Sequence, residues 1–304
     1  MALARLCRRR PRCNPIVREA GDSSPGACGS GRTRGLARAL AVVLLLALAF
    51  ACATSPTGRR QLLLIPETQM AEMGRAAFAE MKSETPVATG GTDAAYVRCV
   101  ADAIVAVLRP EQVEGLAIDR WEVELFQDDT ANAFALPGGK MGVHTGLLDV
   151  AETPSQLAAV LGHEVGHVLA RHGNARVSTS QLAQTGMSVA SVFIGGDAAT
   201  QQQMMGLLGM GVQVGVLMPF SRADESEADV IGLELMARAG FDPREAVTLW
   251  QNMSRASGGQ APPEFLSTHP GHATRISQLQ EEMDEVLPIY EQARAAGRRP
   301  SCRR

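Results

Sequence analysis

Two histidines and a glutamate in the segment His163-Glu164-Val165-Gly166-His167 have the residue types and the spacing of a catalytic metal site. Residues four apart lie on one face of an α-helix, so His163 and His167 can present two imidazole rings to a single ion, with Glu164 beside them. Such a short pattern also occurs by chance on surface helices. Because the flanking residues are mostly apolar, however, these histidines would be costly to bury without partners.

A catalytic zinc ion needs three protein ligands and one open position for water, so a third ligand must come from elsewhere in the chain. Glu225 and Asp229 lie one helical turn apart in the segment 221–229. Glu225 can be the third ligand, and Asp229 can accept the hydrogen bond that a zinc-bound histidine normally donates. We therefore predict one zinc ion per chain, held by His163, His167 and Glu225.

Capping signals predict the helices that must position these residues. The helix that carries the histidines is predicted to begin with Thr153 as N-cap, Pro154 at the first helical position and Gln156 at N3. Gly173 is placed to end it. Further helices are predicted at residues 65–82, 96–108, 221–240 and 242–256. The segment 175–219, rich in Ala, Gly, Met and Gln, predicts a helical hairpin, with membrane contact as the alternative.

Short strands are predicted ahead of the helix that carries the histidines. Residues 121–126 alternate apolar and polar side chains, and two more strands within residues 132–145 are joined through a Pro-Gly-Gly turn. The predicted fold class is α+β, mostly helical with a small β-sheet. The strand that contains Asn132, Ala133 and Phe134 could bind an extended peptide by edge pairing.

The N-terminal residues predict export. An arginine-rich stretch precedes an apolar run at 39–51, which is too short to span a bilayer but has the proportions of a secretory signal core. Ala49-Phe50-Ala51-Cys52 resembles the lipobox of bacterial lipoproteins, in which Cys52 would carry the lipid. An ordinary signal peptide with an incidental cysteine is the alternative. The predicted organisation is a leader and signal peptide at 1–51, an anchor and linker at 52–64, a metallopeptidase domain at 65–290 and a basic tail at 291–304.

The composition bounds the remaining possibilities. The 304 residues are 45% hydrophobic and 20% charged, as expected for a globular protein. The net charge of -3 gives no indication of a basic surface that would bind nucleic acid. Outside the leader and Cys52, the cysteines are Cys99 and Cys302, and the absence of a Cys-x-x-Cys pair excludes a thiolate zinc site. An oxidising compartment would permit a Cys99–Cys302 disulfide, and two free thiols are the alternative.

Several motifs together carry a family resemblance. The chain resembles the gluzincin zinc metallopeptidases, which include HtpX, the CAAX prenyl proteases, Oma and BepA. The motifs that carry the resemblance are His-Glu-x-Gly-His at 163–167, Ser-Arg-x-x-Glu-x-Glu-Ala-Asp-x-x-Gly at 221–232, and Thr268-His269-Pro270 with Arg275-Ile276. The resemblance implies a zincin-type domain. Thr-Gly-Arg-Arg-Gln-Leu at 57–62 resembles the start of lipoprotein members of the family. The chain is most similar to those stand-alone, LoiP-like members, because it shows neither the spanning helices of HtpX nor the tetratricopeptide domain of BepA.

By this resemblance, Glu164 is the catalytic base and Asp229 orients a ligand histidine. His269 would either reach the fourth position of the zinc in a resting state or contact the reaction intermediate, and a purely structural loop position is the alternative. His144 and His172 are predicted to be structural or surface residues.

The predicted function is zinc-dependent hydrolysis of peptide bonds. Zinc would polarise the substrate carbonyl and acidify water, and Glu164 would move a proton from that water to the leaving amine. The resemblance implies damaged or unfolded envelope polypeptides as substrates and a lipid-anchored protein at the outer membrane, facing the periplasm. A chaperone or assembly factor that uses the same groove is one alternative. A structural zinc protein is another, but it would leave Glu164 without a role.

Overall fold

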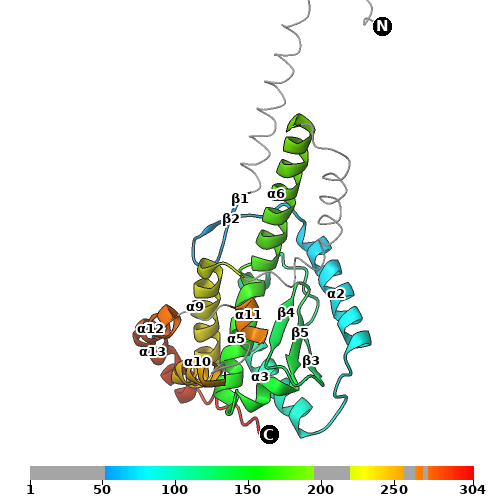
Figure 1. Cartoon of the computed structure of the whole chain (residues 1–304). Helices are drawn as coiled ribbons and strands as arrows, with labels where there is room; N and C mark the ends of the chain where they lie inside the picture. Colours follow the sequence, from blue (N-terminus) through cyan, green and yellow to red (C-terminus); the bar gives the residue numbers. More distant parts are fainter. Residues whose placement is uncertain (1–51, 195–219, 257–263, 270–272) are drawn as a thin grey trace, which may run out of the picture. The chain divides into compact units, whose positions relative to one another are not determined.

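The computed structural model describes residues 52–194, 220–256, 264–269 and 273–304 (Figure 1). The leader and signal predicted at 1–51 and most of the hairpin predicted at 175–219 lie outside these residues. The elements are β1 (Cys52–Thr54), β2 (Arg60–Leu62), α2 (Glu67–Glu84), α3 (Thr92–Val105), α4 (Pro110–Val113), β3 (Glu122–Phe126), β4 (Ala133–Leu136), β5 (Lys140–His144), η1 (Thr145–Asp149), α5 (Pro154–Leu169), α6 (His172–Ile194), α9 (Arg222–Ala239), α10 (Arg244–Ala256), α11 (Glu264–Thr268), α12 (Ala273–Glu281) and α13 (Met283–Ala295).

The three predicted strands form one small sheet with the order β3-β5-β4. β4 and β5 are antiparallel and joined at Gly138 and Gly139, whose positive φ angles of 81° and 74° explain the glycines in the predicted turn. β3 pairs in parallel with the other side of β5. β4 therefore forms one edge of this sheet. The mostly helical α+β fold class is confirmed.

The helix α5 begins as its sequence predicts. The Thr153 side chain accepts a hydrogen bond from the Gln156 amide, and Pro154 takes the first turn. Its end differs from the prediction, because α5 stops at Leu169 and Gly173 lies inside α6. The left-handed residue at the break is Arg171, with φ 58°. The chain turns there, so His172 opens a new helix close to the end of α5.

Small residues let α5 and α9 pack closely against each other (Figure 1). A Cβ atom on Gly162 would lie 2.8 Å from the Gly232 carbonyl oxygen, and one on Gly166 would lie 2.9 Å from the Ala228 carbonyl oxygen. Larger side chains at these glycines would therefore push the helices apart. This close contact brings the side chains of α9 within reach of the histidines of α5.

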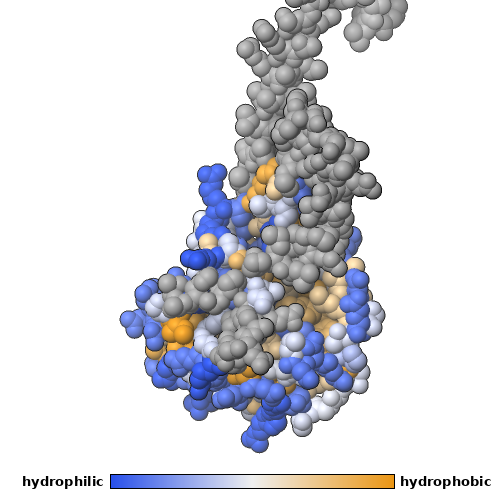
Figure 2. All heavy atoms as spheres, viewed as in Figure 1, coloured by the Kyte–Doolittle hydropathy of each residue, from blue (hydrophilic) through white to orange (hydrophobic). Residues whose placement is uncertain are grey.

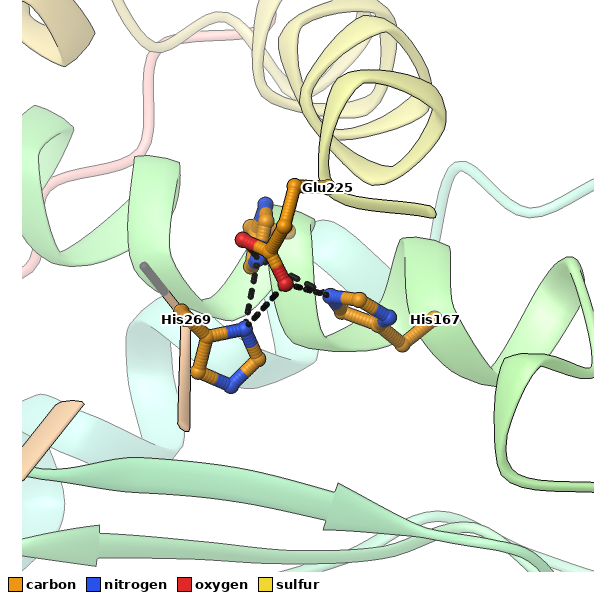
Figure 3. Close-up of side chains that lie close together, drawn as sticks. His167, Glu225 and His269 are labelled. Carbon is orange, nitrogen blue, oxygen red and sulfur yellow. Dashed lines mark hydrogen bonds and ion pairs between the residues drawn. The ribbon is translucent and has the colours of Figure 1, made fainter. Parts of the chain in front are cut away.

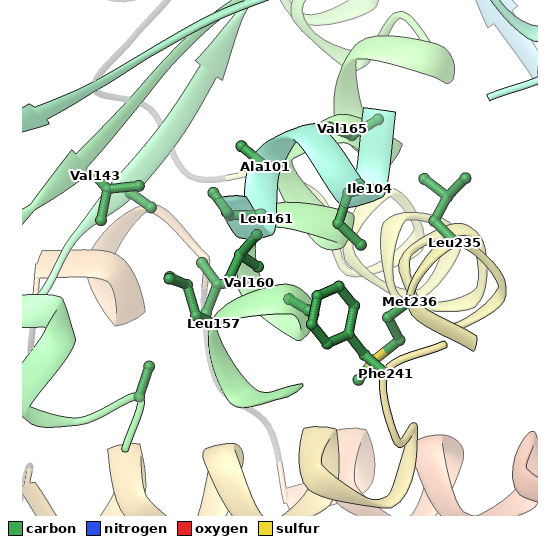
Figure 4. Close-up of a cluster of buried hydrophobic side chains, with 14 of the residues drawn as sticks. Ala101, Ile104, Val143, Leu157, Val160, Leu161, Val165, Leu235, Met236 and Phe241 are labelled. Atoms are coloured by element: carbon green, nitrogen blue, oxygen red, sulfur yellow. The ribbon is translucent and has the colours of Figure 1, made fainter. Parts of the chain in front are cut away.

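The main hydrophobic core surrounds α5. Leu157 and Leu161 of α5 are fully buried, together with Ile104 of α3 and Leu235 of α9 (Figure 4). Truncating such a leucine to alanine typically costs about 2–5 kcal/mol, because a cavity remains. The helix that carries the predicted metal ligands is thus rigidly held on several sides.

The segments at both ends of the described chain are also held to the body. The segment 52–64, predicted as anchor and linker, contains the antiparallel pair β1–β2. At the other end, α13 runs past residue 290 to Ala295, and Cys302 forms a disulfide with Cys99 of α3. The disulfide, rather than two free thiols, is therefore the arrangement in this structure.

Few large hydrophobic side chains of the described residues are exposed. The face in Figure 2 shows hydrophilic side chains alongside apolar areas, and the exposed large hydrophobic residues of the described chain are Leu64 and Leu182. Within the same residues, no helix combines the length and the apolar character that crossing a membrane requires.

Candidate metal centre

Four side chains from three separate parts of the chain converge at one point. Ligand atoms of His163 and His167 on α5, Glu225 on α9 and His269 after α11 all lie within 4.8 Å of one another, and all four residues are buried (Figure 3). The His163 and His167 Nε2 atoms are 3.0 Å apart, and the His269 Nδ1 atom is 3.2 Å from His163 Nε2. The three ligands predicted from the sequence are brought together, with His269 as a fourth.

The outer contact of His163 fixes which nitrogen faces the centre. Its Nδ1 atom lies 2.9 Å from the Asp229 Oδ1 atom, so Nδ1 carries the proton and Nε2 keeps a lone pair. Asp229 therefore has the contact predicted for it. Arg275 in turn donates to Asp229 and, over 2.7 Å, to Glu225 Oε2. Burial raises the pKa of the Asp229 carboxyl, but the charges and hydrogen bonds of Arg275 and His163 together outweigh burial and keep that pKa low.

These donors fit a zinc ion. Inward lone pairs on neighbouring imidazoles cannot hydrogen-bond to each other, and a cation between them removes their repulsion. Burial lowers the pKa of His167 well below its usual value, which favours the neutral, ligating ring. Burial alone would raise the pKa of Glu225, but hydrogen bonds with His167 and His269 hold it well below its usual range. A buried carboxylate and neutral imidazoles are the ligands that catalytic zinc prefers.

His269 is oriented by the rings around it. It stacks on Phe265 at 4.6 Å between centroids, and its amide donates to the Phe265 carbonyl oxygen over 2.8 Å. Its Nδ1 atom lies 3.0 Å from Glu225 Oε1. Phe220 stacks on His167 at 4.0 Å and lies 5.3 Å from the His269 ring. His269 therefore lies at the fourth position of the donor set rather than in an exposed loop.

Glu164 lies beside the centre but is not one of the four converging ligands. Its Oε2 atom accepts a hydrogen bond of 3.1 Å from the Ala135 amide of β4, and its Oε1 atom is 3.3 Å from His269 Nε2. Burial is the main cause that raises the pKa of the Glu164 carboxyl. A carboxylate with a raised pKa accepts a proton more readily, as a general base must.

A cleft runs along β4 past Glu164 and His269. Asn132, Ala133 and Phe134 line it, as predicted for substrate contact, together with Ala135 and Leu136. A second, mostly apolar pocket lies on the other side of Phe220, between α2, α6 and β4. The sheet edge, Glu164 and His269 thus line one cleft.

Two residues contribute to the site although the sequence assigned neither of them a function there, and one of them, Arg275, belongs to the motifs of the family resemblance. The Arg275 guanidinium is buried, lies 3.8 Å from the Trp250 ring centroid and joins Glu225 to Asp229. Two buried carboxylates one helical turn apart were the signal that a cation must lie nearby. Arg176 lines the cleft with its guanidinium 3.9 Å from the Phe220 ring, and burial lowers its pKa to about 10.

Among the residues that the structure describes, the two further histidines, His144 and His172, have structural contacts. His144 Nδ1 lies 2.8 Å from the Thr130 hydroxyl. His172 is buried, and its Nδ1 atom lies 2.9 Å from His167 Nδ1, while Nε2 lies 3.2 Å from Glu227 Oε2. Glu227 therefore points to His172 and away from the four converging ligands.

The fold and the donor set are those of a zinc metallopeptidase. The chain belongs to peptidase family M48, whose family description matches residues 94–283. It is 41% identical over 194 residues to the mitochondrial metalloendopeptidase OMA1 of Schizosaccharomyces pombe. The aligned segment covers 63% of this chain and 53% of that protein. To the human metalloendopeptidase OMA1 it is 30% identical over 248 residues, or 77% of this chain and 46% of that protein.

A bacterial relative matches as well. The chain is 35% identical over 169 residues to the beta-barrel assembly-enhancing protease of Yersinia pestis. The aligned segment covers 54% of this chain and 35% of that protein. The chain therefore spans about half, or less, of the length of these relatives.

Proposed function

We propose that this chain is a zinc-dependent metalloendopeptidase, with His163, His167 and Glu225 as ligands and Glu164 as catalytic base. The observation that carries the proposal is the convergence of these ligands beside a buried carboxylate, Glu164, that contacts the Ala135 amide and is not one of the ligands. Bound zinc would act as a Lewis acid on the scissile carbonyl and lower the pKa of water. Glu164 would take a proton from that water and deliver it to the leaving amine.

The edge strand β4 gives this chemistry a way to hold a substrate. A peptide that pairs with β4 through its backbone would pass Glu164, because the Ala135 amide already contacts that carboxylate. Backbone pairing tolerates many sequences, and the apolar pocket beside β4 suits hydrophobic side chains that unfolded polypeptides expose. These features support unfolded or damaged polypeptides as substrates.

We propose that the described arrangement is a resting state. A catalytic zinc keeps one position open, and His269 lies where that position would be. His269 would then have to leave this position before substrate reacts. If His269 instead donates to the developing oxyanion, its removal would lower turnover rather than raise it.

We further propose that the protein works in the bacterial cell envelope, anchored through a lipid on Cys52 at the outer membrane and facing the periplasm. The lipobox-like residues 49–52 support this location. The name of the Yersinia relative refers to β-barrel assembly, which is consistent with envelope quality control. A chaperone or assembly factor with little proteolysis remains the second candidate, because the same cleft could hold unfolded chains.

Comparison of envelope proteomes tests the proposal. Cells with wild-type protein should lose envelope polypeptides that accumulate in cells with the Glu164→Gln protein, and new cleavage termini should occur only with the wild type. A chaperone would give equal proteomes with both proteins and a defect only when the gene is deleted. That result would contradict the peptidase proposal.

A further inference from the structure

The second ligand histidine, His167, has an outer contact that differs from that of His163. Its Nε2 atom faces the centre, so its outward Nδ1 carries the proton and donates to His172 Nδ1 over 2.9 Å. His172 then carries its own proton on Nε2, which lies 3.2 Å from Glu227 Oε2. The donors follow one direction, from His167 through His172 to a carboxylate.

The Glu227 carboxylate is almost completely buried and is held by the N-terminal segment. The Thr57 hydroxyl and amide donate to Oε1 over 2.7 and 3.2 Å, and Arg59 Nη1 donates to Oε2 over 2.9 Å. Arg59 also contacts Asp224 of α9 at 2.8 Å. Glu227 is therefore held from both sides, by His172 and by this segment.

The N-terminal segment has a defined shape at this contact. The Ser55 and Arg59 backbones close a turn, in which Ser55 N–H donates to Arg59 O over 2.8 Å. The Gln61 side chain donates to the Ala170 carbonyl oxygen over 2.9 Å, in the connection between His167 and His172. We call residues 55–61 the strap. It lies outside residues 94–283, which match the family.

We propose that Thr57 and Arg59 of the strap are positioning residues for the metal centre, which act through Glu227 and His172 on the ring of His167. The inference rests on the proposed function, because it assumes that His167 binds zinc. His163 is held by Asp229 and Arg275 from within the matched segment. The outward Nδ1 atom of His167 contacts His172 rather than a carboxylate, and the strap completes the support of this ring from the segment that follows Cys52.

Zinc affinity of the purified full-length chain tests the proposal. Loss of an outer partner of a metal-bound histidine typically weakens binding about 10–100-fold. Arg59→Ala and Thr57→Val should each raise the zinc Kd about tenfold in competition with a chromogenic chelator, and Glu227→Gln should raise it further. Arg59→Ala should add nothing in the Glu227→Gln background, because Arg59 acts through Glu227. Arg59→Lys should recover part of the loss.

The matched control is Arg60→Ala, because Arg60 is exposed in the same strap and should leave the zinc Kd within about twofold of wild type. Thermal unfolding of the metal-free proteins separates a structural role. Lower unfolding temperatures with an unchanged zinc Kd would overturn the proposal, as would a Kd change equal to that of Arg60→Ala. If Glu227→Gln does not fold, Arg59→Ala decides alone. Failure of the wild type to bind zinc would refute the proposed function instead.

The visible spectrum of the cobalt-loaded protein gives a second readout that does not depend on activity. A displaced His167 ring changes the ligand geometry, so Arg59→Ala should shift the absorption bands, while Arg60→Ala should not. Identical bands in both variants would also overturn a positioning role.

Discussion

The Glu164 carboxylate accepts a hydrogen bond of 3.1 Å from the backbone amide of Ala135. This contact joins the proposed base to the sheet edge that would hold the substrate. It fixes the direction of Glu164 Oε2 while no peptide is bound. It also makes glutamine the right substitution for a test, because an amide oxygen can still accept the Ala135 hydrogen bond.

Glu164→Gln should retain zinc and lose nearly all proteolysis. The substitution keeps the contact with Ala135 and leaves every ligand in place, but the amide cannot take a proton from water. Metal analysis and cleavage of an unfolded substrate, measured on the same preparation, check both parts. Loss of zinc from this variant would refute the assignment of Glu164 as base rather than ligand.

Glu225→Ala should lose both zinc and activity. The change removes a ligand and also leaves the buried Arg275 without one of its carboxylate partners, which adds a loss of stability. Glu234→Ala is a control on the same helix, because Glu234 lies at the surface with Arg109 and Arg238. A wild-type zinc content in Glu225→Ala would show that another carboxylate is the ligand.

His269→Ala should raise the basal cleavage of an unfolded substrate while zinc stays bound. The reason is that His269 lies at the fourth position, where it would exclude the attacking water. A loss of turnover on the order of a hundredfold would instead support a role as oxyanion donor. Unchanged turnover in the zinc-loaded variant would leave His269 as a structural residue.

Cys52→Ser should release the protein from membranes or block its processing. The lipid proposed on Cys52 is the attachment that the sequence indicates, and membrane fractionation measures its loss. Labelling with a fatty-acid analogue gives an independent check. Wild-type protein that takes up no label would contradict lipidation.

Glu122→Gln should destabilise the protein at neutral pH by about 1 kcal/mol after discounting for solvent screening. Glu122 accepts hydrogen bonds from Lys140 and Lys82, the two lysines of the chain, and these lower its pKa from 4.5 to about 2. The ionised carboxylate therefore stabilises the fold above pH 4.5, and this contribution disappears as the pH falls towards 2. Denaturant titrations of both proteins across this range should converge at the acidic end. A constant difference would contradict the prediction.

The sequence by itself determined the local features of the site. The spacing of His163 and His167, the cap at Thr153 and the glycine turn before β5 are decided by neighbours in the chain, and the structure has each of them. The end of α5 was predicted wrongly, because Gly173 carries the residue signal for a helix stop while Arg171 takes the left-handed conformation. Helix propensity does not indicate the break at Arg171. In the structure, His172 directly follows this break and contacts His167 and Glu227.

Only the tertiary structure decided how distant segments complete the site. Arg275 joins Glu225 to Asp229, and Arg59 reaches Glu227 across 168 positions of sequence. Such pairings depend on the packing of α12 against α9 and on the path of the N-terminal strap. A charged side chain in a sequence has many possible partners, and burial in a low-dielectric interior selects the one that neutralises it.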